Sequence, residues 1–162
     1  MKKKAGPSTE YRPLADFRYE IRRFLNFSEC AAREAGVEPH QHQALLAIKG
    51  LPAERKATVG TLAERLQVHH HSAVELADRL QEKGLIRRVR DESDHREVLL
   101  DLTRRGESLL QRLSGPHRAE LLMAGPKLIL ALRAVITGSD RRGSTRMRTK
   151  ARSKRKEHAR GR

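Results

Sequence analysis

Residues 60–106 read GTLAERLQVHHHSAVELADRLQEKGLIRRVRDESDHREVLLDLTRRG. Apolar residues at helical spacing predict a short helix over residues 61–66 and a second helix over about residues 70–83. Gln67 to His69 make the turn between the two helices, and a glycine follows the second one as its C-cap. Strand-forming residues then predict a two-stranded hairpin over residues 85–102, closed by a charged, turn-prone loop.

This order of elements predicts a winged helix-turn-helix, a module that places its second helix in a DNA groove. The second helix carries one apolar stripe, made of Ala73, Leu76, Ala77 and Leu80. Successive helical residues point about 100° apart, so this stripe faces the core and the opposite face is free. That free face carries His71, Val74, Glu75 and Asp78, and it is flanked by His70, Ser72 and Arg79.

The segments before this stretch also predict helices. Pro13 suits a first helical position, and apolar residues recur at mostly helical spacing from there to Gly36. A second helix begins at Pro39 and ends at Gly50. Thr58 and Val59 fit a very short strand, and Gly60 then takes the N-cap of the helix over residues 61–66.

After the hairpin, Thr103 is suited to cap another helix. Gly115-Pro116 should kink or interrupt that helix, and Gly125-Pro126 should start a last one. From residue 138 onward almost nothing is apolar, so this segment cannot bury enough surface to order itself.

The chain is strongly basic, with a formal net charge of +15 over 162 residues, which predicts a polyanionic partner. Residues 138–162 alone carry +9, with 11 Lys and Arg against 2 Asp and Glu. The content of 34% charged and 3% aromatic residues favours a helical protein over a β-sandwich or barrel. The low aromatic content also leaves few rings that could stack on single-stranded bases. This argues against an RNA-binding or ribosome-associated protein.

Several other function classes find no support in the sequence. No apolar run reaches the roughly 18 residues of a membrane span, and no secretory signal is recognisable, so we expect no membrane partner. One cysteine, Cys30, allows no intrachain disulfide and fits a reducing, cytoplasmic setting. For a DNA-binding protein in such a setting we expect association with the nucleoid. No catalytic or cofactor-binding motif occurs, so we expect neither enzyme activity nor a cofactor.

Three strings carry a resemblance to a known family: VGTLAERL at 59–66, ADRLQEKGLI at 77–86, and DESDHR at 91–96 followed by LDLTRRG at 100–106. Together they resemble the MarR family of bacterial transcription regulators over about residues 13–136. The resemblance implies a homodimer with a recognition helix in the major groove and a wing in the minor groove. Many members also bind a small aromatic or acidic ligand. The recognition helix departs from the usual family pattern, because His69-His70-His71 and Val74-Glu75 replace its small hydroxyl, Thr and Arg residues.

These observations predict a mainly α fold with a small β wing and a domain over residues 13–137. The expected subdivisions are a disordered arm 1–12, a DNA-binding lobe at about 57–103, dimerisation helices at about 13–36 and 104–137, and a disordered basic tail 138–162. The residues expected at the dimer interface are apolar: Phe17, Ile21, Phe24, Leu25, Leu121, Leu122, Leu128 and Leu132. We expect a dimeric repressor on an inverted repeat whose symmetry mirrors the protein. The alternative is a weakly specific, nucleoid-type binder driven by the tail.

The residues expected to contact DNA lie on the recognition helix and the wing: His70, His71, Ser72, Val74, Glu75, Arg79, Arg88, Arg90, His95 and Arg96. Glu75 is suited to accept from a cytosine amino group and Val74 to meet a thymine methyl. The alternative for the two histidines is contact with phosphate or solvent only. Arg96 either enters the minor groove or pairs with Asp91 or Asp94 and braces the loop.

Three further features have a plain and a functional interpretation. Consecutive helical histidines point apart, so His69-His70-His71 do not predict a metal site, and His40 and His42 bring no supporting Cys or Asp. Cys30 is interpreted as an ordinary thiol rather than a peroxide sensor, since only Arg33 is a nearby cation. The tail either binds phosphates without reading sequence or serves only as a solubilising extension.

Overall fold

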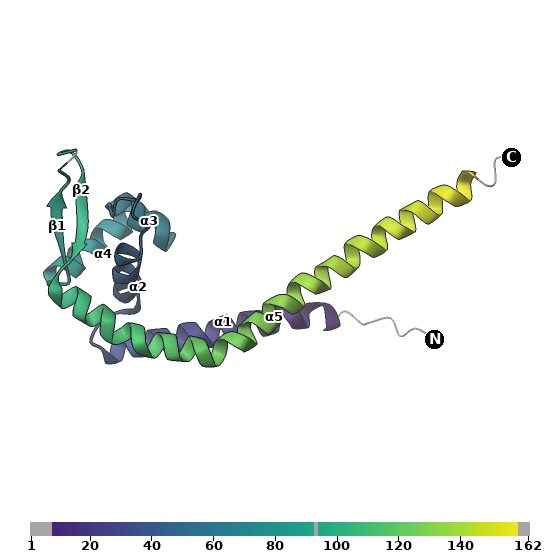
Figure 1. The fold of residues 1–162 in the computed structure, drawn as a ribbon, viewed down its shortest axis with the longest axis horizontal. Helices are drawn as coiled ribbons and strands as arrows, with labels where there is room; N and C mark the ends of the chain where they lie inside the picture. The colour runs from purple at the N-terminus through teal and green to yellow at the C-terminus, as the bar shows by residue number, and fades with distance from the viewer. Residues whose placement is uncertain (1–7, 93, 159–162) are drawn as a thin grey trace. The chain divides into compact units, whose positions relative to one another are not determined.

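The computed structural model describes residues 8–92 and 94–158, with side chains from residue 11 to residue 137 except residue 93 (Figure 1). Its elements in order are α1 (Ser8–Glu34), α2 (Pro39–Lys49), α3 (Val59–Leu66), α4 (His70–Glu82), β1 (Ile86–Arg90), β2 (Val98–Leu102) and α5 (Arg104–His158). The expected mainly helical fold with a small β wing is confirmed. Among the described residues, no helix is both apolar and long enough to cross a membrane.

The chain divides into two compact units. One is the continuous segment Asn26–Ala119, which contains the helix-turn-helix and the wing. The other joins Met1–Leu25 to Glu120–Arg162, and its described helical parts are residues 8–25 of α1 and 120–158 of α5. The border therefore falls inside both long helices, whereas the sequence led us to expect it at their ends.

The core of the helix-turn-helix unit forms where α2, α3 and α4 meet the start of the wing. Leu45, Leu80 and Ile86 are its largest fully buried side chains. Ala73 and Ala77 of α4 are completely buried too, and the half-buried Leu76 packs against this core, so the apolar stripe of α4 faces the core as predicted. Each fully buried leucine contributes about 1.5–3 kcal/mol, and this contribution fixes which face of α4 remains outside.

The start of α3 differs from the prediction. The N-cap is Thr58, whose Oγ1 accepts a hydrogen bond from the backbone N–H of Thr61 at 3.1 Å, and Gly60 lies inside the helix. A threonine hydroxyl satisfies an otherwise unpaired N–H, which a glycine cannot do. The short strand expected at Thr58 and Val59 is likewise absent from the described structure. The carbonyl of Ala57 accepts a backbone hydrogen bond from the N–H of Leu100 in the wing, at 2.7 Å.

The wing is an antiparallel hairpin whose register pairs Ile86 with Leu102 and Arg90 with Val98. Both strands lie within the hairpin predicted over residues 85–102. Ile86, Leu100 and Leu102 are buried, whereas Val89 and Val98 near the loop are about two-fifths exposed. The base of the hairpin is thus anchored in the core and its tip projects from it (Figure 1).

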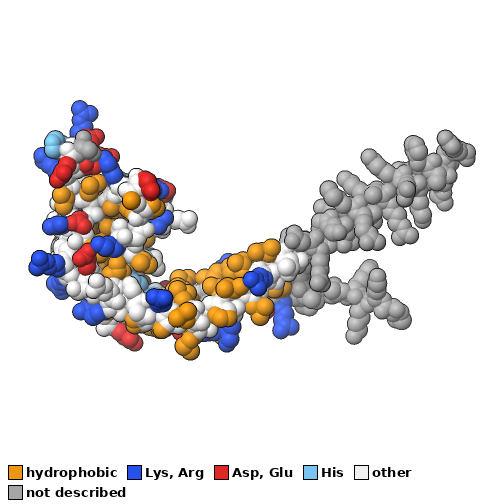
Figure 2. Space-filling model, in the orientation of Figure 1, with side chains coloured by type: hydrophobic (Ala, Val, Ile, Leu, Met, Phe, Trp, Pro, Cys, Tyr) orange, Lys and Arg blue, Asp and Glu red, His pale blue; other side chains and the backbone are white. Residues whose placement is uncertain are grey.

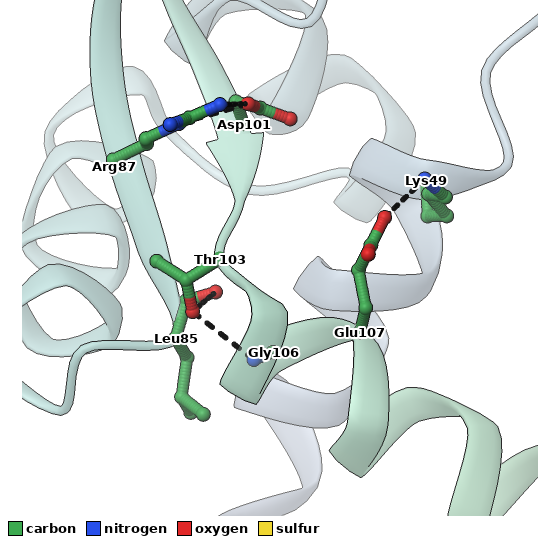
Figure 3. A network of polar contacts seen from close by, with 7 residues as sticks. All are labelled: Lys49, Leu85, Arg87, Asp101, Thr103, Gly106 and Glu107. Atoms are coloured by element: carbon green, nitrogen blue, oxygen red, sulfur yellow. Dashed lines mark hydrogen bonds and ion pairs between the residues drawn. The ribbon is translucent and has the colours of Figure 1, made fainter.

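A tight junction joins β2 to α5, and Figure 3 shows it from close by. As predicted, Thr103 caps the helix, since its Oγ1 accepts from the N–H of Gly106 at 3.1 Å. The same hydroxyl donates to the carbonyl of Gly84 at 2.7 Å, and the N–H of Thr103 donates to the carbonyl of Leu85. These contacts fix the backbone between the end of α4, the wing and α5.

The prolines of the long helices do not end them. α5 runs without interruption through Gly115-Pro116 and Gly125-Pro126, so neither a break nor a new helix occurs there. Near the first proline, side chains make additional bonds to helix carbonyls: Ser114 Oγ donates to Leu110 at 2.7 Å, and His117 Nδ1 contacts Leu113 at 2.6 Å. Tertiary packing of Leu109, Leu110 and Leu113 in the core further offsets the lost backbone bond.

The two ends of the chain also differ from expectation. α1 begins at Ser8 and holds Pro13 in its interior, so Pro13 is not its first residue. The loss of one backbone hydrogen bond is tolerated near a helix end. At the other end, the α5 backbone continues to His158 where a disordered tail was expected. Arg and Lys are good helix formers and no proline follows Pro126, which permits the extension. Residues 1–7 and 159–162, and the side chains beyond residue 137, lie outside the described part.

A pair of histidines, one buried and one half-buried, connects three helices within Asn26–Ala119. His42 of α2 is 3% exposed, and its ring lies 4.7 Å from that of His117 of α5. His117 lies at hydrogen-bonding distance from Ser28 of α1, with Nε2 at 2.8 Å from its Oγ, and packs edge-on against Phe27. Nδ1 of His42 is a buried atom without a hydrogen bond among the described residues. Burial, and then the neighbouring His117, hold the pKa of His42 below its ordinary value.

This arrangement predicts acid sensitivity. A histidine whose pKa is lower in the folded state takes up its proton more readily after unfolding, so its neutral form stabilises the fold above about pH 6.5. We expect the free energy of unfolding to fall as the pH drops below that value, and His42→Gln to flatten this dependence. Denaturant titrations across pH 5 to 8 measure it. The exposed His40 of the same helix provides the control His40→Gln, which should keep the wild-type slope. Identical pH profiles for wild type and His42→Gln would contradict the assignment.

Candidate nucleic-acid interface

The face of α4 that the sequence assigned to DNA is the face that the core leaves free. His70, His71, Glu75 and Arg79 are exposed. Ser72 and Val74 are half-buried at its margins, so their side chains offer less surface than expected. The N-terminal half of the helix thus presents imidazole, hydroxyl and carboxylate groups to the outside.

The three consecutive histidines do not converge. His69 is the N-cap residue of α4 and makes no side-chain capping bond. Its ring stacks on that of His71, with centroids 5.5 Å apart and planes 9° from parallel. Across residues 8–92 and 94–158, no group of three or more His, Cys, Asp or Glu side chains is placed to hold a metal ion. Cys30 is exposed and lies 3.4 Å from Asn26 Oδ1.

Several arginines near this face are paired with carboxylates, which the sequence reading did not foresee. Arg88 of β1 contacts Asp78 of α4 at 2.7 Å and also donates to Gln81 at 2.7 Å. Arg79 contacts Glu75 one turn earlier at 3.2 Å. Arg87 points to the other side of the hairpin and pairs with Asp101 at 2.6 Å (Figure 3). The neighbouring Arg87 and Arg88 therefore point to opposite faces of the hairpin. Arg88 connects the wing to α4.

The loop of the wing is held by a lysine outside the wing. Asp91 is only 7% exposed, and its carboxylate contacts Lys56 Nζ at 2.6 Å. Glu97 contacts the same ammonium at 2.7 Å. Hydrogen bonds to these two carboxylates hold the pKa of Lys56 above its ordinary value. Lys56 lies in the segment before α3, and no local pattern in the sequence marks it as a partner of the wing.

Arg96 lies beyond this lysine–carboxylate cluster. Its backbone N–H donates to Asp94 Oδ1 at 3.0 Å, which shapes the turn. Its exposed guanidinium makes no ion pair or hydrogen bond with the described residues, so the bracing alternative considered for Arg96 is not what the structure shows. Arg90 and His95 are exposed near it. Figure 2 shows basic, acidic and histidine side chains mixed at the tip of the wing.

The Lys56 cluster provides a test of the wing. We expect Lys56→Ala to remove the ammonium from a nearly buried carboxylate, loosen the loop and weaken duplex binding several-fold. Fluorescence anisotropy with a labelled duplex and a thermal melt measure both effects. The neighbouring Arg55 pairs with Glu64 on an exposed surface, at 2.6 Å, and gives the control Arg55→Ala. The account of the wing is wrong if the two variants bind duplex equally well.

The second unit presents an apolar surface in the single chain. All eight residues expected at a dimer interface lie in it. Phe17, Ile21, Phe24 and Leu128 are half-buried, and Leu25, Leu121, Leu122 and Leu132 are exposed. The sequence reading missed further exposed apolar residues nearby, namely Tyr11, Leu14, Tyr19, Met123, Ile129, Leu130 and Ile136. Figure 2 shows hydrophobic side chains gathered along the outer parts of α1 and α5.

A pocket of about 370 Å³ opens beside the first turns of α5. It is lined by Lys49, Glu107, Leu110, Gln111 and Ser114. Lys49 Nζ and Glu107 Oε1 are 2.5 Å apart, and this contact raises the pKa of Lys49 (Figure 3). The pocket thus combines an apolar wall with one charged pair that holds α2 to α5.

Residues 35–97 match the family model described as the MarR family. Over these residues the chain is similar to the winged helix of the MarR family. The match spans α2, α3, α4 and the wing up to Glu97, which are the elements that hold every expected DNA-contacting residue. A search of curated proteins found no match.

Solved structures share the same fold over most of the chain. A MarR family protein from Bacillus stearothermophilus superposes with a TM-score of 0.65 at 19% identity, covering 86% of this chain and 99% of that one. A mutant MepR of S. aureus bound to an oligodeoxyribonucleotide gives 0.54 at 18% identity, covering 83% and 94%. CouR of Rhodococcus jostii RHA1, bound to p-coumaroyl-CoA, gives 0.56 at 19% identity, covering 70% and 83%. At 18–19% sequence identity, these similarities show a shared fold.

Proposed function

We propose that this chain is a transcription regulator that binds double-stranded DNA sequence-specifically as a homodimer. The observation that carries the proposal is the free face of α4 beside the exposed Arg96, on a winged helix similar to that of the MarR family. In this proposal α4 enters the major groove, and Arg96 enters the adjacent minor groove, where a narrow groove attracts an inserted arginine. The mutant MepR structure, with the same fold bound to an oligodeoxyribonucleotide, supports this reading.

The apolar surface of the second unit supports the homodimer. Leu122, Ile129 and Ile136 recur every seven residues along α5 and are 71%, 52% and 53% exposed. A seven-residue apolar repeat places side chains on one side of a helix and is typical of helix–helix contacts. A contiguous apolar surface of this kind marks an interaction site in a protein that is otherwise rich in charge. A second copy of the chain supplies the matching surface under two-fold symmetry.

Repression would follow if the dimer occupies promoter DNA. The subunits of a two-fold dimer present their recognition helices to half-sites about one helical turn apart, so an inverted repeat is the expected operator. A cytoplasmic protein associated with the nucleoid fits this role.

The pocket beside α5 is where we place a releasing ligand. A small acidic or aromatic molecule bound against Lys49 would compete with Glu107 for its ammonium and so act on the α2–α5 contact. Release follows if the bound state changes the spacing of the recognition helices, because a ligand shifts only an equilibrium whose states it binds differently. The CouR structure with p-coumaroyl-CoA and the BpsR regulator of Bordetella bronchiseptica, whose DNA binding is regulated by 6-hydroxynicotinic acid, are relatives in fold with such ligands.

Selection of bound duplexes from a random pool at moderate salt tests the proposal. We expect an enriched inverted repeat. If no sequence is enriched while all duplexes bind, the second candidate function, a weakly specific nucleoid-type binder, replaces it. That candidate draws on the +9 charge of residues 138–162.

The tail has a separate prediction. Each phosphate neutralised contributes about −0.9 to the slope of log affinity against log salt. If half of the 11 tail cations engage DNA, deleting residues 138–162 flattens that slope by about four to five. Affinity should fall similarly for all duplexes, because phosphate contacts carry no sequence information. Binding isotherms of the full chain and of the deletion variant at several salt concentrations give the two slopes. Equal slopes would mean that the tail does not bind phosphates and serves only as a solubilising extension.

A further inference from the structure

The free face of the recognition helix carries an unusual set of charges. Glu75, Asp78 and Glu82 all lie on the side of α4 opposite the buried stripe, and all three are exposed. Carboxylates facing a duplex repel its phosphates, so they lower affinity for DNA in general. Their presence in a chain with a net charge of +15 calls for a specific use on this face.

The three carboxylates differ in their partners. Asp78 is held by Arg88 from β1 at 2.7 Å, and this contact turns it toward the base of the wing. Glu82 is in the last turn of α4, away from the half of the helix that reads bases. Glu75 lies in the middle of the helix, and its Oε2 is 3.2 Å from Nη2 of Arg79. Both of these side chains are about two-thirds exposed, and exposed pairs at this spacing separate readily.

Glu75 and Arg79 together present a carboxylate, which accepts hydrogen bonds, beside a guanidinium, which donates them. In the major groove, cytosine offers an amino donor and guanine offers two acceptors, O6 and N7. The cytosine amino group and guanine O6 are hydrogen-bonded to each other, so they lie about 2.9 Å apart, close to the separation of the two side chains. A carboxylate accepts from the amino group while a guanidinium donates to both guanine acceptors. An A·T pair also has an amino donor, but each of its bases gives arginine only one acceptor.

We propose that Glu75 and Arg79 act as one specificity-determining pair that reads a C·G base pair in each half-site of the operator. This inference rests on the proposed sequence-specific DNA binding and names one base pair of its target. The carboxylate excludes base pairs that give it no donor, and the guanidinium distinguishes guanine from the single acceptors of A·T. The repulsion of phosphates by Glu75 then lowers nonspecific binding, which raises the ratio of specific to nonspecific affinity.

Selection from a random duplex pool, run in parallel with variants, tests the pair. Wild type should enrich a repeat with one invariant C·G pair in each half-site. Glu75→Gln should keep the spacing and the other positions but shift this pair toward A·T, since glutamine makes two bonds to adenine. Arg79→Lys should lower the discrimination for guanine about tenfold, because an ammonium lacks the two-pronged geometry. Glu82→Gln, an exposed carboxylate of the same helix, is the control and should leave the motif unchanged.

The outcomes separate the inference from the proposed function. An enriched repeat that Glu75→Gln leaves unchanged at every position overturns the pair and leaves the regulator intact. A repeat without an invariant C·G pair overturns it as well. If wild type enriches no sequence, the proposed function fails and the pair falls with it. Thermal melts of the variants establish that they fold, which we expect because the altered side chains are exposed.

Discussion

Gly106→Ala is expected to destabilise the protein by about 3 kcal/mol or more, the upper part of the range for overpacked sites. A Cβ at this position would lie 2.1 Å from the carbonyl oxygen of Leu85 and 3.1 Å from its carbon. That carbonyl cannot move away freely, because it accepts from the N–H of Thr103, whose hydroxyl also donates to the carbonyl of Gly84. Figure 3 shows Leu85, Thr103 and Gly106 at this junction. The added methyl group must therefore push α5 away from the base of the wing.

Denaturant unfolding followed by circular dichroism measures this effect. The matched control is Gly60→Ala in α3, where the added Cβ would meet only Thr58 Oγ1 at an ordinary 3.7 Å. We expect that variant to equal wild type or to gain up to about 1 kcal/mol, because alanine is the better helix former. Equal stability of the two variants would show that the junction between β2 and α5 is not as the structure describes it.

The second large effect concerns the dimer. We expect Leu122→Glu combined with Ile129→Glu to give monomers and to lower affinity for an inverted repeat by at least about a hundredfold. Both side chains are more than half exposed in the single chain, so the fold itself should survive the change. A monomer binds one half-site at a time and loses the gain from engaging two linked sites.

Sedimentation equilibrium gives the mass, and gel shifts with one and two half-sites give the loss of affinity. Leu46→Glu is the control, because Leu46 is an exposed leucine of α2 in the other compact unit and outside the expected interface. A double variant that remains dimeric would mean that this surface of α5 is not the interface. A monomeric variant that binds the repeat as tightly as wild type would mean that dimerisation is not needed for binding.

Much of the fold was predictable because short-range patterns determine it. The apolar stripe of α4, the proline and glycine that bound α2, and the Thr103 cap are each set by residues within a few positions. The predictions that failed depended on tertiary packing. Both Pro116 and Pro126 remain inside α5. Near Pro116, buried leucines and side-chain bonds to carbonyls offset the cost of the lost backbone bond.

The candidate site shows the same division. Periodicity identified the free face of α4. Arg96 was predicted because a narrow minor groove attracts an inserted arginine and because the family resemblance places a wing there. Periodicity did not identify Lys56 as the partner of Asp91 or Arg88 as the partner of Asp78, since these pairs join residues from different elements. Such pairs depend on how the wing packs against the helices. The spacing of residues in a single sequence does not predict this packing. The pairing of Glu75 with Arg79 was accessible from their spacing of four and was overlooked.

The central claim is that the free face of α4, with Arg96 beside it, reads the sequence of double-stranded DNA. The most direct test is the ratio of affinities of the full-length protein for its selected inverted repeat and for a scrambled duplex of equal length at physiological salt. We predict a ratio of about a thousandfold or more, falling sharply in Glu75→Gln. A ratio near one, unchanged in that variant, would contradict the account.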